Sequence, residues 1–179
     1  MKRILVTGAY GQLGSELRNI SKKQNHFDWI FCGKRDLDIT DFKNLKDQII
    51  KINPSFLINC AAYTSVDKAE SEFELSDLLN HKSVANLAKF SVIYNFNFIH
   101  ISTDYVFNGK SNVAMSEKSI TNPINMYGTT KLMGELACIR ENPNSIIIRT
   151  SWLYSSYGNN FVKTICKLML EKISLNTNS

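Results

Sequence analysis

The first fourteen residues strongly limit what this chain can fold into. A short apolar run, Ile4–Val6, leads directly into Thr7–Gly14 (TGAYGQLG), whose three glycines are spaced three residues apart. Glycines in a turn between a strand and a helix avoid Cβ clashes and let the backbone approach a pyrophosphate, which the positive helix N-terminus attracts. The motif therefore predicts a dinucleotide-binding turn, although taken alone it could simply connect a strand to a helix.

The rest of the chain alternates predicted strands with predicted helices. We expect strands at Lys2–Thr7, Asp28–Cys32, Ser55–Cys60, Asn97–Ser102 and Ser145–Thr150. We expect helices at Gln12–Lys23, Asp41–Ile52, within Val66–Tyr94, and at Met126–Glu141 and Gly158–Lys172, with a loop at Asn108–Asn125. Strands separated by helices of this length predict an α/β fold, a Rossmann-like doubly wound parallel sheet.

Polar and glycine-rich segments follow four of these strands. They are Gly8–Gly14, Ala61–Thr64, Ser102–Asp104 and Ser151–Tyr154. Because parallel strands end at the same edge of a sheet, all four segments should meet at one edge, where such folds bind their ligands.

Composition excludes several classes of function. No apolar stretch reaches the roughly 18 residues that would span a membrane, and the net charge of +5 is spread along the chain, so we expect no nucleic-acid partner. The four cysteines lack CxxC spacing and mostly lie in apolar segments, which is typical of a reducing cytoplasm. His26, His81 and His100 show no metal-ligand spacing, so we expect structural or loop roles and no metal.

Tyr127 and Lys131 are the candidate catalytic pair. They stand at positions i and i+4 of a predicted helix and therefore share one face. We expect the ammonium to lower the tyrosine pKa from about 10, so that the phenol can give a proton to an alkoxide formed by hydride transfer. A hydroxyl from Ser102 or Thr103 could polarise the same carbonyl. A lone YxxxK pattern also arises by chance in helices, so its position in the fold determines whether the pattern is functional.

The end of the second strand bears on the choice of cofactor. It reads Cys32–Arg35 (CGKR), with no carboxylate before Asp36. An acidic residue near this point binds the ribose of NAD, whereas a basic residue accommodates the 2′-phosphate of NADP. Lys34 or Arg35 therefore favours NADPH over NADH, unless both are ordinary exposed basic residues.

Six segments together resemble the extended short-chain dehydrogenase/reductase superfamily and, within it, the dTDP-4-dehydrorhamnose reductase family. They are Thr7–Gly14 (TGAYGQLG), Leu37–Asp41 (LDITD), Asn59–Glu70 (NCAAYT and VDKAE), Ser102–Phe107 (STDYVF), Pro123–Glu135 (PINMYGTTKLMGE) and Arg149–Thr164 (RTSWLY and GNNFVKT). The glycine motif is common to many dinucleotide-binding proteins, whereas STDYVF and RTSWLY are far more specific.

This resemblance implies a role for individual residues. The implied catalytic residues are Thr103, Tyr127 and Lys131. The implied cofactor-binding residues, besides Lys34 and Arg35, are Gly8, Gly11, Gln12 and Leu13 at the pyrophosphate, Tyr10 in the same turn, Asp38 and Ile39 at the adenine, and Ala61, Ala62 and Tyr63 along the ribose and nicotinamide. Tyr127 and Lys131 also belong to this set, because the lysine can hydrogen-bond the cofactor ribose. The implied substrate-binding residues are Asp104, Tyr105 and Trp152. Asp38 could instead be only a turn residue, and Trp152 could instead belong to the core.

The chain departs from the family pattern in three places. Tyr10 stands where the family commonly has asparagine, so its ring would either crowd the phosphates or pack against the adjacent loop. Residues Ser76–Lys82 are more polar than expected for a helix. Family members continue well beyond residue 179, so we expect a NAD(P)-binding domain over 1–179, with 153–179 leading into a substrate domain that is largely missing.

The resemblance implies reduction of dTDP-4-dehydro-6-deoxy-L-mannose (dTDP-4-dehydrorhamnose) to dTDP-L-rhamnose by NADPH or NADH in the cytoplasm. The expected partner is a sugar nucleotide, and the sequence leaves open whether the protein forms a homodimer. Two alternatives remain. The chain could be a non-catalytic nucleotide-binding module, like the regulatory subunit of methionine adenosyltransferase, or a sugar-nucleotide epimerase or dehydratase that recycles its cofactor.

Overall fold

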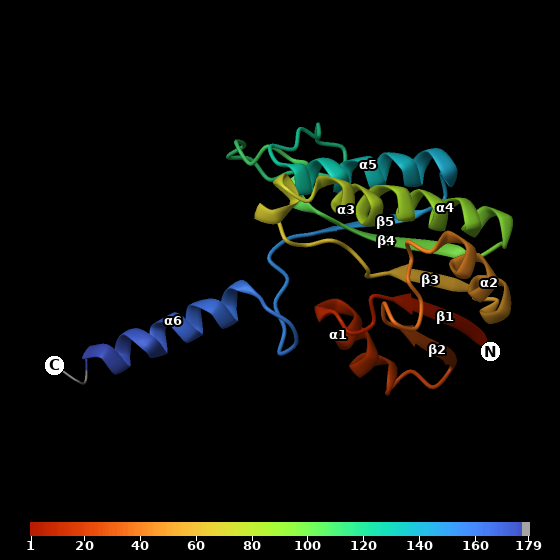
Figure 1. Ribbon diagram of the computed structural model, residues 1–179, viewed down its shortest axis with the longest axis horizontal. Helices are drawn as coiled ribbons and strands as arrows, with labels where there is room; N and C mark the ends of the chain where they lie inside the picture. Colours follow the sequence, from red (N-terminus) through yellow and green to blue (C-terminus); the bar gives the residue numbers. More distant parts are fainter. Residues whose placement is uncertain (177–179) are drawn as a thin grey trace.

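A computed structural model describes residues 1–176, with side chains described up to Glu171. Within these residues five parallel strands form one sheet in the order β2-β1-β3-β4-β5 (Figure 1). The strands are β1 (Lys2–Thr7), β2 (Phe27–Cys32), β3 (Phe56–Asn59), β4 (Asn97–Thr103) and β5 (Ile146–Thr150). The predicted α/β fold with a parallel sheet is confirmed, and each strand lies within two residues of its expected bounds.

The helices of the described residues connect the strands. They are α1 (Gln12–Ser21), α2 (Phe42–Ile52), the short 3-10 helix η1 (Asp67–Glu70), α3 (Phe73–Asp77), the π-helical turn η2 (Leu78–Lys82), α4 (Ser83–Ile93), the 3-10 turn η3 (Asp104–Val106), α5 (Met126–Glu141) and α6 (Phe161–Asn176). The expected loop at Asn108–Asn125 carries no helix or strand. The described part of the chain contains no helix that is both long and apolar enough to cross a membrane.

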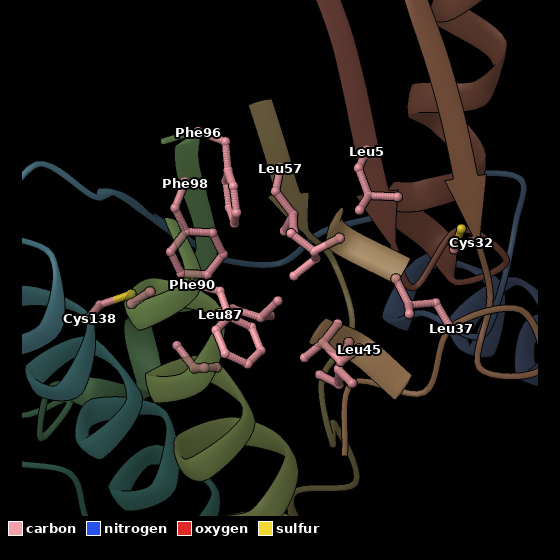
Figure 2. Close-up of a cluster of buried hydrophobic side chains, with 14 residues drawn as sticks. Leu5, Cys32, Leu37, Leu45, Leu57, Leu87, Phe90, Phe96, Phe98 and Cys138 are labelled. Carbon is pink, nitrogen blue, oxygen red and sulfur yellow. The ribbon is translucent and has the colours of Figure 1, made fainter. Parts of the chain in front are cut away.

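The main core lies where α2, α4 and α5 pack on one face of the sheet. Leu5, Leu57 and Phe98 occupy neighbouring register positions on β1, β3 and β4, so their side chains point to the same face. Against them pack Leu45 from α2 and Leu87 from α4, both fully buried (Figure 2). Burying each such side chain contributes roughly 1.5–3 kcal/mol.

The strand order places a switch point between β1 and β3. From β1 the chain moves to β2 on one side, and then crosses to β3 on the other side of β1. The helices that follow β1 and β3 therefore lie on opposite faces of the sheet (Figure 1), which leaves a crevice at the carboxyl ends of these strands.

Two regions differ from the rest of the fold. The segment Val66–Tyr94 is not one helix, because it is divided into η1, α3, η2 and α4. The polar residues singled out at Ser76–Lys82 coincide with the π-helical turn. At the other end, α6 extends away from the sheet (Figure 1), and its apolar residues Leu168, Met169 and Leu170 are exposed.

Candidate active site

The glycine turn is packed tightly against the loop that follows β3. Gly8 has φ of +63°, and a Cβ at this position would lie 2.5 Å from the main-chain nitrogen of Ala61. A Cβ on Gly14 would collide with the Gly8 carbonyl oxygen, so this glycine lets α1 begin close to the turn. The N-cap of α1 is Gly11, whose position carries no side-chain capping bond. The turn thus directs a positive helix end at the crevice.

A cleft of about 290 Å³ lies over this turn. Its lining includes predicted cofactor-binding residues from three loops, namely Gly8, Tyr10, Gly11, Lys34, Asp38, Ile39, Ala61 and Ala62. The predicted residues Gln12, Leu13, Arg35 and Tyr63 are not part of this lining. Gln12 instead accepts a hydrogen bond from the Asn160 amide, which joins the glycine turn to the segment before α6.

Tyr10 packs against the adjacent loop. Its ring lies over Gly33, where a Cβ would collide with the ring carbons. The Arg18 guanidinium stands 4.6 Å from the ring centroid, a cation–π distance. Of the two outcomes considered for this residue, the structure therefore shows packing on the loop after β2, with Tyr10 still at the edge of the cleft.

The part of the cleft formed by the loop after β2 holds both signs of charge. Lys34 lines it, while the Asp36 carboxylate accepts a hydrogen bond from the Gly33 main-chain N–H at 2.8 Å. Asp38 also lines it and accepts hydrogen bonds from the Thr40 N–H and hydroxyl at 2.9 and 2.7 Å. Burial raises the pKa of Asp38, but these hydrogen bonds and the charge of Lys34 together outweigh burial and lower the pKa overall. Asp38 is thus a turn residue that also faces the cleft.

Gly128 lets the start of α5 lie close to the STDYVF segment. Asn125 caps the helix by accepting a hydrogen bond from the Gly128 N–H at 2.7 Å. A Cβ on Gly128 would collide with the Tyr105 carbonyl oxygen, so only glycine lets α5 approach the STDYVF segment this closely. As a result the Tyr127 ring contacts the Tyr105 ring edge-on, with 5.5 Å between centroids.

A second cavity, of about 580 Å³, lies beside the glycine cleft along the same sheet edge. Its lining includes the predicted residues Thr103, Asp104, Tyr105, Tyr127 and Trp152. Trp152 is 72% exposed and contacts Phe161 edge-on, so it is not a core residue. The Thr103 hydroxyl donates to the Asp104 carboxylate and accepts from the Tyr105 N–H, both at 3.2 Å, and its proximity lowers the pKa of Tyr127. The Ser102 hydroxyl has no partner among the described residues.

The expected effect of Lys131 on Tyr127 is wrong for this structure. Burial raises the pKa of Tyr127, the nearby Thr103 hydroxyl lowers it, and the charge of Asp104 raises it again, so the net shift is upward. The Lys131 amine points toward the sheet and donates to the Ile101 carbonyl at 2.7 Å. Burial lowers the pKa of Lys131 to about 8. The two side chains share a helix face, but burial dominates both pKa values.

The sequence did not predict two residues that hold the main chain of this site in place through hydrogen bonds. Asn80, in the π-helical turn, accepts a hydrogen bond from the Tyr63 N–H at 2.9 Å and donates to its carbonyl at 3.0 Å. Glu70 accepts a hydrogen bond from the Met126 N–H and so holds the start of α5. The polarity of Ser76–Lys82 was the available signal for Asn80, because buried polar residues need partners.

Comparisons with known proteins agree with this geometry. The family model described as the RmlD substrate binding domain matches residues 1–178. The dTDP-4-dehydrorhamnose reductases of Salmonella typhimurium and Aggregatibacter actinomycetemcomitans are 41% and 40% identical, over 96% and 94% of this chain. The crystal structure of the Bacillus anthracis dTDP-4-dehydrorhamnose reductase in complex with NADP superposes with a TM-score of 0.91 at 40% identity, over 96% of this chain and 61% of that one.

The chain spans only 57–58% of the length of these two curated relatives. The match nevertheless includes the glycine turn, both cavities and the start of α6. The chain belongs to the RmlD substrate binding domain family, which confirms the resemblance to the dTDP-4-dehydrorhamnose reductases that its motifs predicted.

Proposed function

We propose that the protein reduces the C4 ketone of dTDP-4-dehydro-6-deoxy-L-mannose with NADPH or NADH, giving dTDP-L-rhamnose. The observation that carries this proposal is that Thr103 and Tyr127 line the same cavity, beside a glycine-turn cleft. The relatives' names and the NADP bound to the Bacillus anthracis structure support it.

The residues around the cleft fit a dinucleotide. Gly8 and Gly14 leave no side chain between the turn, the start of α1 and the loop after β3, which is the close backbone approach a pyrophosphate needs. In this proposal Gly8, Gly11, Gln12 and Leu13 hold the pyrophosphate. Asp38 and Ile39 hold the adenine, Lys34 and Arg35 the 2′-phosphate, and Ala61, Ala62 and Tyr63 the ribose and nicotinamide.

The cofactor, when bound, supplies a hydride to the ketone carbon. Tyr127 gives its hydroxyl proton to the ketone oxygen as negative charge develops on it. The Thr103 hydroxyl orients this ketone oxygen and the Tyr127 hydroxyl. Lys131, once protonated, favours the phenolate left behind. Asp104, Tyr105 and Trp152 face the sugar nucleotide from the rim of the cavity.

Two further statements belong to this proposal. Residues 1–179 form the NAD(P)-binding domain, with 153–179 leading into a substrate domain, and the way α6 leaves the sheet supports this division. The reaction takes place in the cytoplasm, which the four free cysteines support, because disulfides are rare there.

The test is NADPH oxidation with the sugar substrate, measured beside cofactor binding by fluorescence. We expect binding, and oxidation in stoichiometric amounts. Failure to bind NADPH would contradict the proposal. If the sugar were converted without net consumption of added NADPH, the protein would instead be an epimerase or dehydratase.

A second candidate is a nucleotide-binding module without turnover. The raised pKa of Tyr127 and the inward position of Lys131 favour it, because neither group is prepared for proton transfer in this structure. Binding of NADPH without any oxidation, in a form of the protein as long as its relatives, would support the module.

A further inference from the structure

A chain of buried polar side chains runs across the sheet and ends at Lys131. The Thr7 hydroxyl on β1 donates to Asn59 Oδ1 at the end of β3, at 2.6 Å. Asn59 Nδ2 faces His100 Nδ1 on β4 at 3.3 Å, and His100 Nε2 faces Lys131 Nζ on α5 at 3.5 Å. All four residues are buried, with His100 at 0% and Lys131 at 2% exposure. The proposed mechanism gives no role to Asn59 or His100.

Hydrogen-bond partners fix the orientation of the Asn59 amide. Its Oδ1 lies 3.2 Å from the Ala61 main-chain nitrogen, which can only donate. The atom facing Ala61 is therefore the oxygen, and the atom facing His100 is the NH₂ group. Since that NH₂ group can only donate, His100 Nδ1 must present a lone pair.

This orientation sets the tautomer of the imidazole. A neutral histidine whose Nδ1 accepts a hydrogen bond carries its proton on Nε2. Complete burial also lowers the pKa of His100 well below its usual value. The ring is therefore neutral and aims an N–H at the Lys131 amine.

An ammonium group cannot accept that hydrogen. It has three donors and no lone pair, so two N–H groups would face each other. An unprotonated amine satisfies every partner, because it accepts from His100 and still donates to the Ile101 carbonyl at 2.7 Å. Burial lowers the pKa of Lys131 to about 8, which brings the unprotonated form within reach.

Other titratable groups near Lys131 come from its own helix. Glu135 raises the Lys131 pKa but is engaged by the Arg149 guanidinium at 2.6 Å. Cys138 also raises the Lys131 pKa and is itself held protonated by burial, which raises its own pKa to about 12. Tyr127 lies one turn earlier on α5, with its pKa raised. On β4, His100 is the group that meets the amine.

We propose that His100 is a positioning residue: with its tautomer set by Asn59, it holds unprotonated Lys131 against the sheet, and protonated Lys131 leaves it to face Tyr127. The movement of protonated Lys131 toward Tyr127 rests on the proposed function, whereas the contact between His100 and unprotonated Lys131 does not. The proton that Lys131 takes up comes from water.

The test uses nitrogen NMR on the full chain, in which three histidines give few signals. We expect His100 to show a protonated Nε2 and a bare Nδ1 between about pH 6 and 9. We expect the Lys131 amine, assigned with Lys131→Met, to titrate near 8. A proton on Nδ1, or an imidazolium, would overturn the proposal without needing any variant.

Asn59→Asp provides the second measurement. This nearly isosteric carboxylate can accept from Nδ1 but cannot donate to it, so the tautomer should invert and Nε2 should accept from an ammonium. The Lys131 pKa should then rise by at least about one unit, a tenfold change in its proton affinity. An inverted tautomer with an unchanged Lys131 pKa would contradict the proposal.

Asn142→Asp is the matched control. Asn142 is also buried, and its NH₂ group donates to the Ser91 hydroxyl at 2.7 Å, far from this chain of side chains. It should leave both NMR signatures unchanged. Because neither signature requires turnover, an inactive protein would refute the proposed function while leaving this result intact.

Discussion

The two cavities at the sheet edge are built in different ways. The glycine-turn cleft is shaped by backbone, since Gly8 lets the turn contact the loop after β3 and Gly14 lets α1 contact the turn. The neighbouring cavity depends on side chains, among them the hydroxyls of Thr103 and Tyr127, whose surroundings come from β4 and α5. A site formed by the backbone can be recognised from the spacing of its glycines in the sequence. The protonation of side chains such as Tyr127 depends on the burial and charges around them, which the spacing does not give.

Tyr127→Phe should have the largest effect and should affect the two cavities most differently. The ring stays, but the acidic hydroxyl is lost, so turnover should fall about 10²–10⁴-fold. NADPH affinity should stay unchanged, because the backbone cleft is untouched. Steady-state oxidation and a fluorescence titration measure the two effects. Tyr94→Phe, remote at the end of α4, serves as the control, and equal turnover in both variants would remove Tyr127 from the mechanism.

Gly8→Ala should damage the backbone cleft. Its methyl group would lie 2.5 Å from the Ala61 nitrogen, so the turn must move and NADPH binding should be lost. Gly109→Ala is a matched control, because Gly109 also has positive φ (+65°) but a Cβ there meets nothing within 4 Å. The control should cost only the roughly 1–2 kcal/mol of the left-handed conformation and should keep binding. Equal losses would mean that the close contact is unimportant.

Lys131→Met tests the burial of an amine that lines neither cavity but lies on α5, the helix that carries Tyr127. Because the Lys131 pKa falls from 10.5 to about 8 on folding, the unfolded chain binds more protons between these values. The free energy of unfolding should therefore rise with pH in this window, by up to roughly 1.4 kcal/mol per pH unit. The variant should lack this rise when urea unfolding is measured between pH 8 and 10. A slope shared by both proteins would contradict the buried, weakly basic amine.

Lys34→Ala should have the smallest effect and should act only on the first cavity. Loss of one charge-assisted contact should weaken NADPH binding about tenfold and leave NADH binding nearly unchanged. Arg35→Ala, next to it but outside the cleft lining, should do less. Equal losses for both cofactors would show that Lys34 does not contact the 2′-phosphate.

The sequence predicted the fold well, because its signals are local. Apolar runs and the glycine turn lie within a few residues of the elements they define. The division of Val66–Tyr94 could not be predicted, since it depends on Asn80 reaching the Tyr63 backbone across 17 residues. The pKa direction of Tyr127 failed for a similar reason, because burial by distant elements outweighs its neighbour on the helix.

The central claim is that both cavities belong to one site, with the dinucleotide running from the glycine turn to Tyr127. A crystal structure of this chain with NADP⁺ tests it most directly. We predict the pyrophosphate at Gly8–Gly11 and the nicotinamide ring within contact of the Tyr127 hydroxyl. A nicotinamide ring bound away from Tyr127, or a Tyr127 hydroxyl turned from the cleft, would contradict the account.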